Sequence, residues 1–357
     1  MNNKPIKTTV VGCGGMARYH LERMLVDFPG TQVPVLCEPS QAMYAQMARV
    51  FEEAGRAVPP NEPNLQKLLA TYGPELDTAF IVTPHAYHHE QARACLEAGL
   101  DVLLEKPMVM TAQEAESLVA TCERTGRLLV VAFQGGLSPN LRAAITLLRS
   151  GRMGRLLNID GLIWQNWAPL SDGTWRQRPE LAGGGFFFDT GAHLLNTVSE
   201  LAGEPFVQVA AWLDNQERAV DISGVVMGRL RSGTLVTLNA CGNTSPSCAS
   251  EIRVLGTEGM LRTGAWGEFL EVQYDQKEGW QPVEVRASRG PWEQFLLAHE
   301  GRIANPSPPQ VGLRMARLWD AIRSSATLGG ALVSIVGESA TPSIAGTGSE
   351  PLPREAL

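Results

Sequence analysis

Residues 8–17 read Thr-Thr-Val-Val-Gly-Cys-Gly-Gly-Met-Ala, and this stretch decides the fold. A β-branched run ends in Gly12-Cys13-Gly14-Gly15-Met16-Ala17, which fits the pattern G-x-G-x-x-A at the passage from a strand to a helix. Small residues there let the backbone approach a pyrophosphate, and the first N–H groups of the helix attract negative charge. An ordinary tight turn gives the same pattern, so the neighbouring sequence must separate the two readings. We expect cofactor contacts from Gly12, Gly14, Gly15, Met16 and Ala17.

A carboxylate follows the second predicted strand, residues 33–37. Glu38 stands 21 residues after Ala17, where it can accept hydrogen bonds from a ribose diol. The alternative role for Glu38 is a charge that initiates the next helix. No Lys or Arg lies between Glu38 and Arg49 to neutralise a 2′-phosphate. The sequence therefore predicts NAD as the cofactor in preference to NADP.

Short apolar runs alternate with helical periodicity through the first 134 residues. The predicted strands are 8–11, 33–37, 78–82, 102–104 and 128–133, with helices at 15–28 and 40–54. Further helices have start signals at Thr83-Pro84 and at the capping box Thr111-x-x-Glu114, and end signals at Gly99 and Gly126. Continuous apolar strands separated by helices indicate a parallel sheet covered on both faces. Residues 1–134 are thus predicted to form an α/β, doubly wound Rossmann domain.

The pattern changes after Gly136. Helices are predicted at 139–150, 190–201 and 311–325, and a strand at 156–167. From 207 to 285 strand signals dominate, with hairpin turns at Arg231–Gly233 and Gly256–Gly259. We expect residues 135–337 to form an α+β domain with a large, mainly antiparallel open sheet for substrate binding and oligomerisation. Residues 338–357 are rich in Ser, Thr, Pro and Gly and are predicted to be a loose tail.

Composition excludes several classes of protein. The 357 residues are 44% hydrophobic and 19% charged, with a net charge of −7, which argues against binding to nucleic acid or to an anionic membrane. There is no apolar run of about 18 residues and no secretory signal pattern. The six cysteines form no C-x-x-C pair. These features predict a cytoplasmic enzyme without a structural metal.

Two loops at strand ends carry reactive side chains. Residues 83–90, Thr-Pro-His-Ala-Tyr-His-His-Glu, hold three of the six histidines, and His85 is expected to share a helical face with His88 or His89. A third metal ligand is not evident, so surface or substrate-edge histidines are the preferred interpretation. The second loop is Glu105-Lys106-Pro107, where partial burial would let the Lys106 amine share a proton with a substrate hydroxyl. An exposed, solvated lysine is the alternative.

Residues 183–193, Gly-Gly-Gly-Phe-Phe-Phe-Asp-Thr-Gly-Ala-His, are the most informative part of the second half. Asp189 and His193 are four residues apart, which in a helix places them on one face. A carboxylate beside an imidazole orients the ring and favours its protonated form, which suits a base that accepts an alcohol proton. The alternative is an N-cap aspartate bonded to a neighbouring histidine.

Together these motifs resemble the glucose–fructose oxidoreductase and inositol dehydrogenase family, Gfo/Idh/MocA, over residues 7–330. The resemblance implies catalytic roles for Lys106, Asp189 and His193, and a dimer or tetramer formed through the second-domain sheet. It also implies cofactor contacts from Thr83, Pro84, His88, Glu105, Lys106 and Gln134. The chain departs from the family pattern at Asn196 and at Gln134-Gly135-Gly136, which affects the expected substrate more than the reaction.

The resulting hypothesis is an NAD(H)-dependent oxidoreductase that interconverts a secondary alcohol and a ketone on a sugar, inositol or related polyol. Lys106, Asp189 and His193 would contact the substrate together with Trp164, Asn166, Trp175 and Arg176, although the tryptophans could equally be structural. One alternative keeps the cofactor but cleaves glycosides by transient oxidation and elimination. The other is a non-catalytic NAD-binding regulatory protein.

Overall fold

The protein forms two compact units in a computed structural model that describes residues 5–335. The first unit contains the chain up to Phe133, Gly173–Gly184 and Arg289–Ala316. The second contains Gln134–Asp172, Gly185–Ser288 and residues 317–335. The domain boundaries expected from sequence stay predictions, and the proposed tail, 338–357, lies outside the described residues.

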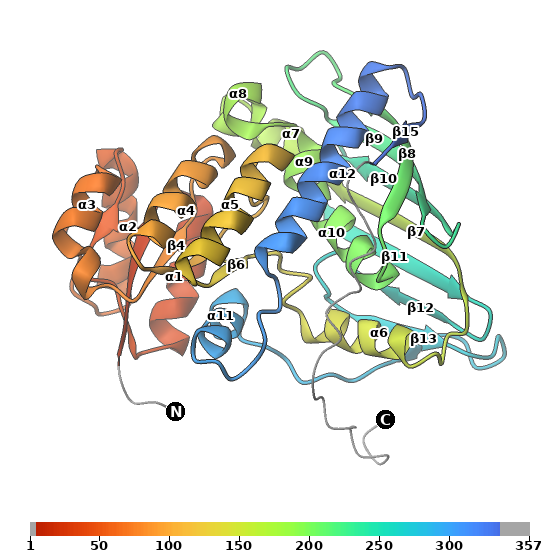
Figure 1. Cartoon of the computed structure of the whole chain (residues 1–357), viewed down its shortest axis with the longest axis horizontal. Coiled ribbons are helices and arrows are strands. Elements are labelled where there is room, and N and C mark those ends of the chain that lie inside the picture. The colour runs from red at the N-terminus through yellow and green to blue at the C-terminus, as the bar shows by residue number, and fades with distance from the viewer. Residues whose placement is uncertain (1–4, 336–357) are drawn as a thin grey trace. The chain divides into compact units, whose positions relative to one another are not determined.

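The first unit is built on a parallel sheet in the order β2-β1-β4-β5-β6, with β3 paired to β1 (Figure 1). Its strands are β1 Ile6–Val11, β2 Thr31–Gln32, β3 Leu36–Cys37, β4 Thr78–Ile81, β5 Asp101–Leu104 and β6 Leu129–Val131. Every residue of β4 is buried, which requires cover on both faces of the sheet. The predicted Rossmann-like parallel sheet is confirmed.

One helix of the first unit, α5, begins and ends at the chemical signals that the sequence predicts. The helices of this unit are α1 Gly15–Asp27, α2 Gln41–Glu53, α3 Leu65–Tyr72, η1 Gly73–Glu75, η2 His85–Tyr87, α4 His88–Glu97, α5 Ala112–Thr125, η3 Trp175–Gln177, α8 Pro179–Ala182 and α11 Pro291–His299. The capping box of Thr111 and Glu114 starts α5, and Gly126 ends it with a left-handed φ of 65°. On α11, the Trp292 ring stacks on Phe80 of β4, so this late segment covers the sheet.

Two of the predicted elements are wrong in detail, and proline is the cause in both. Of the strand expected over residues 33–37, only Leu36–Cys37 forms as β3, while β2 precedes the expected range, because Pro34 has no N–H to give to a neighbouring strand. The helix expected to start at Thr83-Pro84 starts instead at His88, after the short η2 turn. Pro84 has an extended ψ of 144°, which does not continue into a helix. His85 and His88 therefore belong to different elements.

The second unit contains a nine-stranded sheet in the order β14-β13-β12-β11-β7-β10-β9-β8-β15. Its strands are β7 Leu156–Gln165, β8 Phe206–Asp214, β9 Ser223–Leu230, β10 Leu235–Cys241, β11 Cys248–Gly256, β12 Met260–Thr263, β13 Leu270–Gln273, β14 Gln281–Pro282 and β15 Val333–Ser334. The β7–β10 pair is parallel and the other pairs are antiparallel. A mainly antiparallel sheet is thus confirmed, and both predicted hairpin turns join consecutive strands.

Helices pack on one face of this sheet and leave the other face open. The helices are α6 Pro139–Arg149, α7 Trp167–Leu170, α9 Phe186–Asp189, α10 Gly191–Ala202 and the part of α12, Pro309–Thr327, that follows Ala316. In the second unit of Figure 1, α10 lies against β7 and β11. The opposite face exposes apolar side chains, with Leu162 42%, Met227 49% and Leu235 50% exposed.

No helix among residues 5–335 is both long enough and apolar enough to cross a membrane.

Candidate active site

The glycine turn between β1 and α1 has the geometry that its sequence predicts. Gly12 has a φ of +95°, and a Cβ there would lie 2.4 Å from the Val82 carbonyl oxygen. Nothing lies within 4 Å of a Cβ placed on Gly14, which is the N-cap of α1. The backbone therefore packs closely on one side and leaves open space in front of the first N–H groups of α1. This arrangement fits a pyrophosphate.

Glu38 is held beside this turn by hydrogen bonds within the chain. Its carboxylate accepts hydrogen bonds from the backbone N–H of Cys13 at 2.7 Å and of Ser40 at 2.8 Å. The Asn61 side chain bonds both the N–H and the carbonyl of Glu38, at 3.0 and 2.8 Å. The Glu38 residue is 7% exposed. A carboxylate has about four acceptor positions, so Glu38 can still accept from a diol.

Lys106 lies two residues after the end of β5 and is joined to Pro107 by a cis peptide bond. The preceding Glu105 is buried, and one of its oxygens accepts the Lys106 N–H at 3.1 Å. Its other oxygen lies 2.8 Å from Nε2 of His20 on α1. Burial alone would raise the pKa of Glu105, but the His20 hydrogen bond and the charges of His20 and Lys106 outweigh it and hold that pKa below its usual range. Glu105, as a buried anion, thus links α1 to the Lys106 loop.

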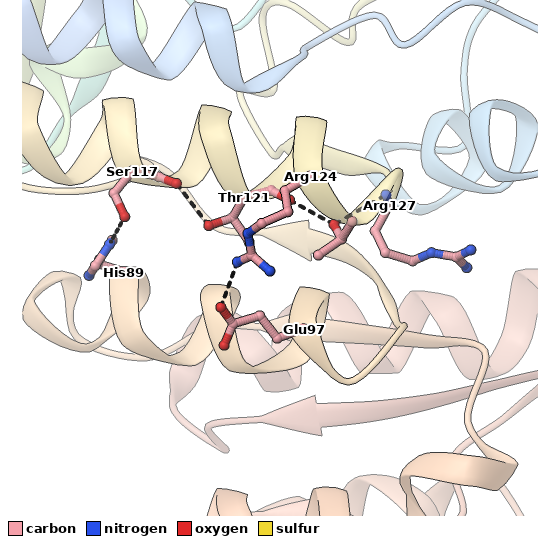
Figure 2. Close-up of polar contacts among 7 residues, drawn as sticks. His89, Glu97, Ser117, Thr121, Arg124 and Arg127 are labelled. Atoms are coloured by element: carbon pink, nitrogen blue, oxygen red, sulfur yellow. Dashed lines mark hydrogen bonds and ion pairs between the residues drawn. The ribbon is translucent and has the colours of Figure 1, made fainter.

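The three clustered histidines each contact a different part of the protein. The ring nitrogens of His88 lie 2.9 Å from the carbonyl oxygens of Thr83 and Pro107, so His88 ties the Thr83 and Lys106 loops together. Burial lowers the pKa of His88, and the two carbonyl oxygens act in the opposite direction. His85 bonds the Ala182 carbonyl, whereas His89 bonds Ser117 between α4 and α5 (Figure 2). Residues 5–335 contain no group of three or more metal-ligating side chains placed to hold an ion.

Asp189 and His193 lie on two consecutive short segments and not on the one helix that their spacing predicts. Asp189 is the last residue of α9, and His193 is the third of α10. The helical ladder is interrupted at Thr190, whose carbonyl accepts the His193 N–H at 3.1 Å. Both side chains are buried, with the residues 5% and 8% exposed. The apolar phenylalanines of α9 supply the surrounding wall.

Neighbouring elements of the second unit fix this pair. The Trp167 indole donates a hydrogen bond to the Asp189 carboxylate at 2.9 Å. Thr190, between the two residues, donates through Oγ1 to the Gln165 side chain at 3.0 Å. The Trp266 ring lies 5.7 Å from the His193 ring, centre to centre, at a tilt of 52°. The Asp189 carboxylate is therefore held by an indole N–H, and the His193 ring lies beside a second indole.

The structure does not bring all the predicted substrate residues to this pair. On β7, Gly161 faces α10, since a Cβ there would lie 2.7 Å from the Leu194 side chain. Side chains alternate along a strand, so Trp164 lies on the opposite face of the sheet, with Leu162. Asn166 follows β7 and is the N-cap of α7.

The remaining predicted residues are divided between the units. Trp175 and Arg176 belong to the first unit, where the Arg176 guanidinium lies 4.6 Å from the centre of the Trp175 ring and the same ring meets His85 edge-on. Lys106 also belongs to the first unit, whereas Asp189 and His193 belong to the second, which begins at Gln134.

Four polar or aromatic residues near these groups escaped prediction: His20, Asn61, Asp221 and Trp266. Asp221 accepts backbone hydrogen bonds from Gly185 and Phe187 across more than thirty residues of sequence. Nothing in the local sequence around any of these residues distinguishes it from a surface side chain.

The NAD-binding Rossmann-fold profile of the GFO/IDH/MocA oxidoreductases matches residues 6–133, and the profile of their C-terminal domain matches residues 141–262. The chain belongs to the GFO/IDH/MocA family. It is 30% identical over 240 residues, 66% of this chain and 68% of the relative, to a dTDP-3,4-didehydro-2,6-dideoxy-α-D-glucose 3-reductase from Saccharopolyspora spinosa. It is 26% identical over 283 residues, 77% of this chain and 73% of the relative, to an uncharacterized oxidoreductase of Schizosaccharomyces pombe.

Among solved GFO/IDH/MocA-like folds, the WlbA dehydrogenase from Bordetella pertussis, in complex with NADH and UDP-GlcNAcA, superposes with a TM-score of 0.77. Its sequence is 22% identical, and the match covers 93% of this chain and 99% of that one. At this identity the likeness establishes the fold. The family membership establishes an oxidoreductase with an NAD-binding Rossmann fold.

Proposed function

We propose that this protein is an NAD(H)-dependent oxidoreductase that interconverts a secondary alcohol and a ketone on a sugar, inositol or related polyol. The observation that carries the proposal is the buried pair of Asp189 and His193, held by the Trp167 indole. An acid–base pair of this kind, in a chain with a pyrophosphate-compatible glycine turn, suits removal of a hydroxyl proton.

NAD supplies the hydride acceptor in this reaction, and NADH the donor. His193 accepts the proton of the reacting hydroxyl, and Asp189 orients the imidazole or binds a neighbouring hydroxyl. Lys106 stabilises the negative charge that develops on the carbinol oxygen. Trp266 offers an aromatic surface next to His193, a type of surface that packs well against the apolar face of a sugar ring. Asn166, Trp175 and Arg176 remain candidate substrate contacts.

The cofactor is NAD in preference to NADP under this proposal. Glu38 is a buried carboxylate fixed at the glycine turn by two backbone N–H groups. A 2′-phosphate placed there would meet a like charge with little solvent to screen it.

The test measures initial rates of the wild type with NAD and with NADP on inositols, aldoses, anhydrosugars and glycosides. We expect the Lys106→Ala and His193→Ala variants to lose about 10²–10⁴-fold in kcat, while calorimetry finds NADH binding unchanged for His193→Ala and largely intact for Lys106→Ala. His89→Ala is the matched control. His89 lies on α4, and in Figure 2 its ring bonds the side chain of Ser117 on α5. Full turnover in both site variants would refute the roles, and aglycone release without NADH accumulation would replace the reaction by glycoside cleavage.

We also propose that the open face of the second-unit sheet binds a second copy of the chain, as a homodimer or within a homotetramer. Leu162, Met227 and Leu235 expose close to half of their surface there. The Arg253–Asp160 ion pair at 2.7 Å lies on adjacent strands β11 and β7, which adds polar specificity to an apolar surface. A cytoplasmic location stays a prediction.

A further inference from the structure

Three consecutive backbone N–H groups at the start of α9 donate to a single residue, Asp221, in the connection between β8 and β9. The Asp221 carboxylate accepts from Gly185 at 2.6 Å and from Phe187 at 2.8 Å. The carbonyl of Asp221 accepts the N–H of Phe186 at 2.8 Å. Asp221 is 6% exposed, so these bonds are made away from water.

The first N–H groups of a helix have no partner within the helix. A side chain close in sequence usually caps them, but Gly185, the N-cap of α9, has none to offer. A Cβ on Gly185 would lie 1.9 Å from the Asp221 carbonyl oxygen. The missing side chain is thus what allows the segment to seat directly on Asp221.

Asp189 lies at the other end of the same four-residue segment. Its N–H donates to the Gly185 carbonyl at 2.8 Å, so the backbone of Asp189 follows the position of Gly185. Its carboxylate receives the Trp167 indole hydrogen bond. A shift of residues 185–187 would therefore change the distance from the indole to Asp189.

The charges of the two carboxylates also interact. Burial raises the pKa of Asp221, the N–H groups of Phe187 and Gly185 oppose this, and the negative charge of Asp189 adds to the rise. The backbone N–H groups of Gly185 and Phe187 therefore stabilise the charged form of Asp221 in a buried setting, against the repulsion from the Asp189 carboxylate. Replacing Asp221 removes both an anchor and a neighbouring charge from the site.

We propose that Asp221 is a positioning residue, which seats the 185–187 backbone and thereby places the Asp189 carboxylate for the alcohol–ketone reaction. The catalytic part of this inference rests on the proposed function. Its structural part, the placement of Asp189 by Asp221, does not. Asp221 acts on Asp189 through the Gly185–Asp189 segment.

The test uses the full chain with Asp221→Asn, which keeps the shape but replaces one acceptor oxygen with an NH2 group that can only donate a hydrogen bond. Trp167 is the reporter: its indole N–H signal is assigned among the eight tryptophans of the chain by Trp167→Phe in 15N–1H spectra. We expect Asp221→Asn to shift the Trp167 indole signal. We also expect kcat to fall by about 10–100-fold with KM for NAD unchanged, because small displacements of positioned groups carry losses of this size.

Ser325→Ala is the matched control. Ser325 is also fully buried in the second unit and accepts a backbone N–H, that of Ala211 at 2.9 Å, but it lies on α12 and bonds β8. We expect this variant to lower the melting temperature without moving the Trp167 signal or kcat. If Asp221→Asn likewise lowers only the melting temperature, the positioning role is overturned. If the wild type oxidises no polyol, the proposed function fails, while the indole signal still decides whether Asp221 places Asp189.

Discussion

Replacing His20 with leucine tests the buried hydrogen-bonded pair, His20 and Glu105, that joins α1 to the Lys106 loop. The side chains of His20 and Glu105 are 13% and 10% exposed, and Nε2 lies 2.8 Å from Oε1. After the replacement, the Glu105 carboxylate still accepts the hydrogen bond from the Lys106 N–H at 3.1 Å. Removing the partner of a buried carboxylate leaves an uncompensated charge, which costs about 3–5 kcal/mol of unfolding free energy.

Proton uptake by Glu105 limits this loss. Neutralising a carboxyl of reference pKa about 4.3 costs about 3.7 kcal/mol at pH 7, at about 1.36 kcal/mol per pH unit. We therefore expect the His20→Leu variant to lose about 3 kcal/mol at pH 7. At pH 4.5 protonation costs under about 0.5 kcal/mol, so the part of the deficit that comes from neutralising Glu105 in the variant should vanish, while the stabilising contribution of Glu105 in the wild type remains.

The sign follows from the pKa of Glu105, which is held below its usual range in the folded protein. Its stabilising contribution is present above the unfolded-state pKa and is lost as the pH falls through the folded-state pKa. Urea denaturation followed by circular dichroism at pH 7 and pH 4.5 measures the effect. His20→Gln, which keeps an N–H donor at a similar position, is the control and should lose about 1 kcal/mol. An equal deficit for His20→Leu at both pH values would refute the electrostatic argument and assign the loss to packing.

Two further predictions concern other parts of the molecule. The Asp101 carboxylate, 2.7 Å from Nδ1 of His299, raises the pKa of that histidine, so its contribution is complete below the unfolded-state pKa and is lost as the pH rises through the folded-state pKa. The melting temperature of the wild type should exceed that of His299→Asn most at about pH 6, near the reference histidine pKa, and the gap should close by alkaline pH; a gap that widens with pH contradicts this. On the open sheet face, Met227→Glu combined with Leu162→Glu should convert a dimer to a monomer in light-scattering measurements, and an unchanged mass would exclude this face as the interface.

Sequence signals were sufficient wherever the determining interaction is local. The capping box at Thr111 and the αL glycine at Gly126 each depend on atoms within a few residues of one another. For that reason, both helix signals can be recognised from the sequence alone. The motif of Glu105-Lys106-Pro107 was likewise placed correctly at the end of a buried strand.

Long-range interactions account for what the sequence did not reveal. The partners His20 and Glu105 are separated by 85 residues, and Gly185 and Asp221 by 36. The spacing of Asp189 and His193 suggested one helix, but Asp221 seats Gly185–Phe187 as a separate turn and the ladder breaks at Thr190. Composition could not place the Trp164 side chain, because only the register of β7 decides which face of the sheet it occupies.

The first unit is assembled from segments that lie far apart in the sequence, and this affects its folding during synthesis. Trp292 of α11 donates its indole hydrogen bond to Thr31 and stacks on Phe80, although about 260 residues separate it from its first partner. A ribosome adding about 5–20 residues per second must therefore run for many seconds before the N-terminal Rossmann sheet receives this cover. Until then, the nascent chain carries an incompletely shielded apolar surface that is open to chaperones.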